Sequence, residues 1–91
     1  MNTQPYKVSA IWTEATLPDA IRREHRTKAG VWGLLRVLEG EVRLHFEGEA
    51  EPVLVTPDRP ALIPPQKTHH VECGGAMRMC VEFYREQPRL G

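Results

Sequence analysis

Cysteine and serine are scarce in this sequence of 91 residues, and their scarcity excludes several kinds of protein. Only Cys73 and Cys80 are present, at a spacing that matches no standard zinc or redox motif. We therefore expect reduced thiols, and neither a disulfide framework nor a zinc finger. Ser9 is the only serine and has no candidate base nearby in the sequence, so a serine nucleophile is not expected.

Net charge and long apolar segments are also absent. Twelve Lys and Arg residues balance twelve Asp and Glu residues, so no long-range field favours nucleic acid or an anionic membrane as a partner. No apolar run approaches the roughly 18 to 20 residues that cross a bilayer. The first ten residues, MNTQPYKVSA, lack the apolar region of a secretion signal. We expect a cytoplasmic protein.

Enzyme signatures are missing as well, because the sequence contains no GxSxG, P-loop, GxGxxG, HExxH or paired CxxC motif. The length allows one domain, residues 1–91, with a core from about residue 6 to about residue 85 and a flexible C-terminal tail. So small a core needs a well-closed fold, an oligomer contact or a metal ion for stability.

Short apolar segments separated by Gly and Pro make up most of the chain, which indicates an all-β fold of seven or eight strands in a barrel or sandwich. The predicted strands are 8–12, 31–38, 41–46, 52–56, 61–63, 69–73 and 76–84, and residues 21–26 fit either a helix or a strand. The clearest predicted hairpin joins 31–38 to 41–46 through Glu39-Gly40.

A second hairpin is predicted at Gly74-Gly75. A two-residue loop would pair His69 with Cys80 and place both on one face of the sheet. The residues of that face would be His69, Val71, Cys73, Arg78, Cys80, Glu82 and Tyr84. An imidazole, a thiol and a carboxylate together are ligands that a divalent transition metal accepts. A three-residue loop would instead shift the register by one residue and place His69 beside the methionines.

Other candidate residues have simpler interpretations. His45 alternates with charged residues and is expected to be solvated, while His69 and His70 point to opposite faces, so at most one of them serves a given site. The two cysteines are expected to be small buried hydrophobes. The stripe Met77, Met79, Val81 and Phe83 is most simply core, and an outward-facing stripe would instead call for a partner subunit.

Several segments together carry a family signature. Residues 37–42 and 62–69 have the strand-turn-strand and proline-turn-histidine patterns of the cupin superfamily. Residues 25–32, 64–72 and 82–84 are similar to the TehB/YeaR-like domain family within it. The resemblance covers roughly residues 6–85 and implies a cupin-like double-stranded β-helix, or jelly-roll barrel.

The resemblance implies an incomplete metal site. Cupins that bind a metal take two His and a Glu from the first motif and one His from the second, and here only His25 and His69 match. Thr27 stands where the second His would be, so Glu82 or Cys80 would have to substitute. A site of His25, His69 and Glu82 would suit zinc, iron or manganese.

Our leading hypothesis is a homo-oligomeric, dimeric cupin-like protein that binds a small molecule or a metal ion in its cavity. His25, His69 and Glu82 are the predicted metal ligands, and Thr27, Cys80, Arg78 and Tyr84 the predicted ligand-binding residues. The alternatives are a metal-dependent enzyme acting on a small molecule and a non-catalytic sensor or accessory domain that binds a partner protein. The family resemblance suggests a link to stress or tellurite resistance. Its full-length members carry their methyltransferase chemistry in a separate domain, so methyl transfer is not expected of these 91 residues.

Overall fold

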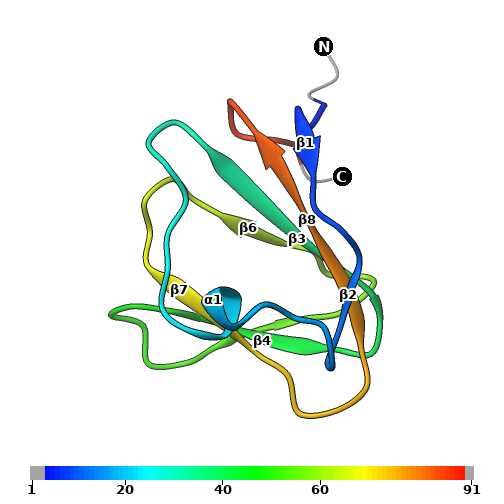
Figure 1. The fold of residues 1–91 in the computed structure, drawn as a ribbon. Coiled ribbons are helices and arrows are strands. Elements are labelled where there is room, and N and C mark those ends of the chain that lie inside the picture. The colour runs from blue at the N-terminus through cyan, green and yellow to red at the C-terminus, as the bar shows by residue number, and fades with distance from the viewer. Residues whose placement is uncertain (1–3, 90–91) are drawn as a thin grey trace.

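Two antiparallel sheets form the body of the protein in a computed structural model that describes residues 4–89 (Figure 1). The first sheet has the order β1-β8-β3-β6, with β2 also pairing with β8, and the second has the order β5-β4-β7. The strands are β1 (Lys7–Val8), β2 (Trp12–Thr13), β3 (Trp32–Glu39), β4 (Val42–Phe46), β5 (Val53–Val55), β6 (Ala61–Ile63), β7 (His69–Glu72) and β8 (Arg78–Tyr84). A single helical turn, α1 (Asp19–Arg22), lies beside β7. The predicted all-β class is confirmed.

The core lies between the sheets and follows the alternation of the strands. In β4, Val42 and Leu44 are buried while Arg43 between them is exposed. On the facing sheet, Leu35 of β3 and Met79 of β8 are fully buried. Side chains two residues apart point to the same face of a strand, so each sheet contributes one apolar face to the core.

The stripe of methionines belongs to this core, as its simpler interpretation predicted. Met77, Met79 and Val81 are all buried, and Phe83 packs against them in part. The stripe therefore offers no exposed surface that calls for a second subunit. The predicted homodimer now rests on the small size of the core alone. Within the described part of the tail Pro88 is buried, and residues 90–91 lie outside the described residues.

Both predicted hairpins are wrong in their pairing. β3 pairs with β6 and β8, and β4 pairs with β5 and β7, so residues 31–38 and 41–46 lie in different sheets. β7 likewise pairs with β4 and not with β8, which follows it after residues 73–77. The turns at Gly40 and at Gly74-Gly75 carry the chain across the core, so the strands that they join belong to facing sheets.

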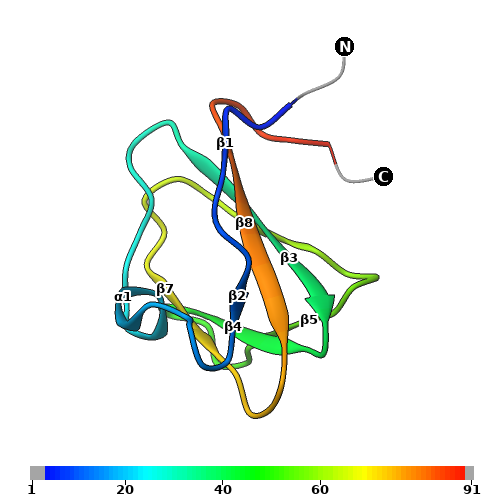
Figure 2. The ribbon, with the colours of Figure 1, turned by 45° about the vertical axis from the view of Figure 1, so that its right-hand side comes forward.

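Most connections cross between the sheets in this way. From β3 to β8, only the connection from β4 to β5 joins strands of the same sheet. Figure 2 shows the sheets as two sides of a wedge that meet near the end of β3, with α1 and the chain that follows it on the open side. Within residues 4–89, no helix has the length and apolar character that crossing a membrane would require.

Candidate functional site

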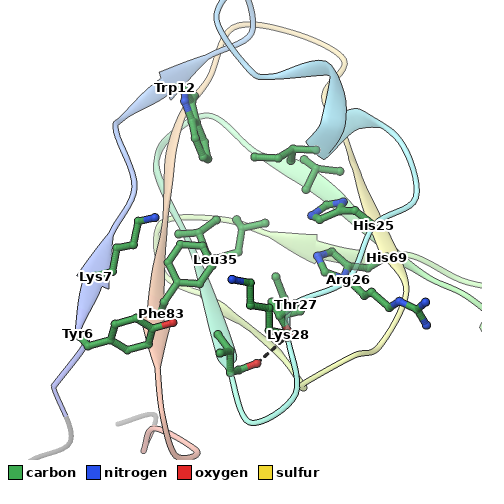
Figure 3. Close-up of a pocket in the computed structure, with 15 residues that line it drawn as sticks. Tyr6, Lys7, Trp12, His25, Arg26, Thr27, Lys28, Leu35, His69 and Phe83 are labelled. Atoms are coloured by element: carbon green, nitrogen blue, oxygen red, sulfur yellow. Dashed lines mark hydrogen bonds between the residues drawn. The ribbon is translucent and has the colours of Figure 1, made fainter.

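A cavity of about 320 Å³ opens on the side where α1 and the chain after it lie between the sheets (Figure 3). Its volume is at the small end of the range of about 300–1,000 Å³ that is typical of ligand sites. The lining residues are Tyr6, Lys7, Trp12, Ile21, His25, Arg26, Thr27, Lys28, Val31, Leu35, Ile63, His69, Val71, Val81 and Phe83. Aliphatic and aromatic side chains predominate, and no carboxylate is among them.

His25 and His69, the two histidines that match the cupin motifs, meet in the wall of this cavity. Their backbones form a bridge in which each N–H donates to the other's carbonyl, at 2.9 and 2.8 Å. This bridge brings the imidazole ring centroids to 4.2 Å, with an angle of 56° between the ring planes. The sequence separation of the two residues is large, so the bridge and not local structure creates the pair.

Backbone carbonyls hold one nitrogen of each ring. His25 Nδ1 lies 3.0 Å from the carbonyl oxygen of Arg23, and His69 Nδ1 lies 2.7 Å from that of Lys67. A carbonyl oxygen can only accept, so Nδ1 is the donor in each ring, and in the neutral form of a ring it carries the proton. The Nε2 atoms on the opposite edges are then free to accept a hydrogen bond from a ligand.

Burial determines the charge of the His69 imidazole, the more buried of the two rings. His69 is 3% exposed, and desolvation lowers its pKa below the ordinary value of 6.5. The hydrogen bond to the Lys67 carbonyl acts in the opposite direction, and the nearby His25 and His70 add to the lowering. His69 is therefore neutral at pH 7, and its Nε2 is an acceptor.

Thr27 stabilises one wall of the cavity through two hydrogen bonds. Its hydroxyl donates to the Val31 carbonyl at 2.8 Å and accepts from the backbone N–H of Gln66 at 3.2 Å. The first bond, drawn in Figure 3, lies within the loop of residues 26–31, and the second ties that loop to the connection between β6 and β7. The predicted ligand-binding role of Thr27 stays a prediction, and the hydroxyl has a structural task in addition.

The predicted juxtaposition of Cys80 and Glu82 with His69 is wrong. Val81 and Phe83 line the cavity, so the alternating Cys80, Glu82 and Tyr84 point to the opposite face of β8. The error follows from the hairpin that does not form. The prediction that Cys80, Glu82 and Tyr84 share one face of β8 was correct. His69, however, lies on the side of Val81, as the three-residue loop at Gly74-Gly75 would have predicted.

Glu82 belongs instead to a hydrogen-bonded group on the outer face of the first sheet. It accepts from Arg36 Nε at 2.9 Å and from the hydroxyl of Tyr84 at 2.6 Å. Arg78, at the start of the same strand, lies 3.5 Å from Glu39. These contacts use the carboxylate and the phenol within the fold, away from the cavity.

Both cysteines are free thiols, as the sequence predicted. Burial raises the pKa of the Cys80 thiol above its ordinary value, and the Glu82 carboxylate adds to the shift. The pKa of Tyr84 is also raised, first by burial and then by its hydrogen bond to Glu82. Neither group ionises near neutral pH, so this outer group has no activated nucleophile.

The remaining histidines lie on the outer face of the second sheet. His45 Nε2 lies 2.8 Å from Glu72 Oε1, and its ring is stacked on that of His70, with centroids 4.5 Å apart. The His45 side chain is 32% exposed, so it is solvated in part, as expected, and is also held by these two contacts. Its contact with Glu72 lowers the pKa of that carboxylate. Within residues 4–89, no three His, Cys, Asp or Glu side chains are grouped so that they could hold a metal ion.

Sequence reasoning missed the cationic residues of the cavity. Lys7 lies opposite Phe83 in the pairing of β1 with β8, and partners in a register share a face of the sheet. Lys28 enters from the loop that Thr27 anchors. Single charged residues in a short strand or a loop look solvated in sequence, so no local signal could have found either.

The comparison with known protein families shows which family this chain belongs to. The TehB-like domain model matches residues 7–81. The chain belongs to the TehB-like domain family. The predicted family is therefore confirmed.

Two curated relatives of this TehB-like domain come from Haemophilus influenzae strains 10810 and Rd. Each is described as a probable S-adenosyl-L-methionine-dependent methyltransferase TehB and is 33% identical over a 72-residue alignment that covers 74% of this chain. The chain spans 25% of the length of each relative. The likeness is therefore to one part of those proteins.

Solved structures support the same relationship. The crystal structure of TehB from Haemophilus influenzae has a TM-score of 0.81 at 29% identity, and the match covers 91% of this chain and 31% of that one. A protein from Escherichia coli strain K12 has a TM-score of 0.79 at 26% identity, and the match covers 97% of this chain and 94% of the other. In the second case the TehB-like fold accounts for nearly the whole chain.

Proposed function

We propose that this TehB-like domain binds a small molecule in the cavity between its sheets. The observation that carries the proposal is a cavity of about 320 Å³ with apolar walls and two imidazoles whose Nδ1 atoms are occupied by backbone carbonyls. Apolar walls supply affinity by burying ligand surface, and a few convergent polar groups fix the orientation. His25 and His69 orient the ligand by accepting hydrogen bonds through Nε2.

The fold that we propose for the domain is a cupin-like jelly roll, which stacks two antiparallel sheets joined by Greek-key connections. Support comes from the connections between β3 and β8, nearly all of which cross from one sheet to the other. The bridge of His25 to His69 also adds the start of a further strand beside β7. This arrangement places the two cupin-motif histidines next to each other.

A metal ion is the second candidate occupant, and the residues around the histidines fit it poorly. The two Nε2 atoms could supply only two metal ligands, whereas a stable site for zinc, iron or manganese usually takes three or more from the protein. Glu82 and Cys80, the predicted substitutes, lie on the other face of β8. The other charged side chains that line the cavity, Lys7, Arg26 and Lys28, are cationic and would repel a metal ion.

We propose ligand recognition and not methyl transfer for these residues. The relatives are named as S-adenosyl-L-methionine-dependent methyltransferases, and that cosubstrate carries a positive sulfonium group. The cavity has cationic side chains and no carboxylate, so its electrostatics disfavour such a ligand. A sensor or accessory role, in stress or tellurite resistance or elsewhere, is compatible with recognition alone.

Fragment binding followed by NMR tests the proposal. The ¹⁵N-labelled protein is titrated with a library of neutral and anionic fragments of about ten to fifteen non-hydrogen atoms, a size whose affinity is measurable by this method. We expect amide shifts to cluster at Leu35, Val71 and Val81. Val81→Phe, which adds bulk to the wall of the cavity, should weaken them, and Val53→Phe on the exposed part of β5 should not. Shifts confined to residues outside the cavity would overturn the proposal.

Elemental analysis separates the metal alternative. The protein, purified without a tag or chelator, is compared with a variant that carries His25→Ala and His69→Ala. We expect substoichiometric metal in both samples. Near-stoichiometric metal that is lost in the double variant would instead establish a histidine metal site and would overturn the reading of these imidazoles as hydrogen-bond acceptors.

A further inference from the structure

The balance of positive and negative charge around the cavity differs from that of the whole protein. The sequence is neutral overall, with twelve basic and twelve acidic residues. The cavity lining nevertheless includes Lys7, Arg26 and Lys28 and no acidic residue. A neutral protein that places lysine ammonium groups and no carboxylate around its cavity creates a local positive potential there.

Within the described residues, some basic side chains outside the cavity are neutralised by carboxylates, which the two lysines of the lining are not. Arg36 and Arg78 pair with carboxylates on the outer face of the first sheet, and Lys67 pairs with Glu49. Among residues 4–89, by contrast, neither Lys7 nor Lys28 forms an ion pair with a carboxylate. Their charges are available to a ligand.

The two lysines approach the cavity from different elements. Lys7 extends from β1 beside the ring of Phe83, with Nζ 6.0 Å from the ring centroid. Lys28 extends from the loop that the Thr27 hydroxyl holds against Gln66. Figure 3 shows both amino groups directed toward the space around Leu35 and Phe83, while the guanidinium of Arg26 points away from it. Both lysines are exposed, so they lie at the mouth of an otherwise apolar cavity.

From this placement we infer that the ligand is a small organic anion, with an apolar body inside the cavity and a carboxylate or a similar group held between Lys7 and Lys28. The inference rests on the proposed ligand-binding function. Burial of the apolar body supplies most of the affinity, and charge-assisted hydrogen bonds from the two ammonium groups select the anion. An inorganic oxyanion would leave the apolar walls without a partner, so an amphiphilic anion fits better.

A matched pair of probes tests the charge. 3-Phenylpropionate and 3-phenylpropanamide have nearly the same shape and differ in charge, and both are titrated against the full protein at low salt. We expect the acid to bind about tenfold more tightly, which corresponds to about 1.4 kcal/mol. The difference should shrink as salt is added, because the lysines are exposed and screened.

Lysine variants then locate the anion. The double variant Lys7→Met and Lys28→Met should weaken the acid about tenfold and leave the amide unchanged. Lys67→Met is the matched control, since Lys67 is paired with Glu49 and does not line the cavity, and it should change neither affinity.

The outcomes distinguish the two levels of the proposal. Equal affinities for acid and amide at the cavity would overturn the anion inference and leave ligand binding intact. An acid whose affinity is unchanged in the double lysine variant would overturn it as well. If neither probe binds and the fragment library also gives no cavity shifts, the proposed function itself fails.

Discussion

Gly40 allows a direct test of the crossed connections. Its φ is +75°, and a Cβ built on it would lie 2.4 Å from the Ala76 carbonyl oxygen and 3.2 Å from Met77 Cα. The turn after β3 therefore packs against the connection between β7 and β8. Gly48 is a matched control, because its φ is +83° but a Cβ there would have no neighbour within 4 Å. The two glycines share the backbone conformation and differ only in the neighbouring backbone.

The expected losses follow from these two geometries. The left-handed conformation costs a residue with a Cβ about 1–2 kcal/mol, which is the whole expected effect of Gly48→Ala. Gly40→Ala adds the displacement of the Ala76 backbone, comparable to overpacking at about 1–3 kcal/mol, for a total of roughly 2–5 kcal/mol. A protein of 91 residues has a free energy of unfolding of about 5–14 kcal/mol, so the Gly40 variant loses a large share of it.

Urea unfolding followed by the fluorescence of Trp12 and Trp32 measures both losses. We expect Gly40→Ala to unfold at a clearly lower urea concentration than Gly48→Ala, with an unchanged m-value. In thermal unfolding the midpoint should differ between the variants by about 4–24 °C, since they differ by about 1–3 kcal/mol and 1 kcal/mol corresponds to about 4–8 °C at this size. Equal losses would refute the close approach of the two connections.

Three further predictions concern single side chains. Because burial lowers the pKa of His69 below 6.5, acid favours the unfolded chain, so this contribution to stability is fully present well above pH 6.5 and is lost as the pH falls below that value. His69→Asn, which keeps a donor for the Lys67 carbonyl, should flatten this slope in urea unfolding, and an unchanged slope would contradict the assignment. Glu82→Gln should lower the free energy of unfolding by about 1 kcal/mol and leave fragment affinity unaltered. A loss of affinity would show that Glu82 contributes to binding in the cavity. In Cys73→Ala, the buried Cys80 should react with a thiol reagent only when the protein unfolds, and fast reaction of the folded variant would show that the thiol is accessible.

The sequence predicted the strands far better than their partners. Residues 61–63 were predicted without error, and β4, β5 and β7 lie within one residue of their predicted ends, because alternation is a local property. The residues at Gly40 and Gly74-Gly75 predict a reversal of the chain. They do not indicate whether the next strand pairs with the preceding strand or joins the facing sheet. That choice depends on packing between residues distant in sequence.

The candidate site was predictable in one part only. His25 and His69 were found because they stand in motifs, and the structure brings them together through their backbones. Glu82 was assigned to the wrong site because its face was inferred from a hairpin. Lys7 and Lys28 had no motif and no periodicity, and only the register of β1 with β8 and the anchoring of the loop reveal their place.

The backbone bridge of His25 also links occupancy of the cavity to the closing of the fold. Two hydrogen bonds attach the segment after α1 to β7, and the same residues supply the imidazole rings that line the cavity. Opening of that segment would separate the rings and carry Lys28 away from Lys7, so the open form would bind the ligand less well. By mass action, a bound ligand then slows hydrogen exchange at the amides of His25 and His69. A bound ligand would therefore favour the closed form of this wall of the cavity.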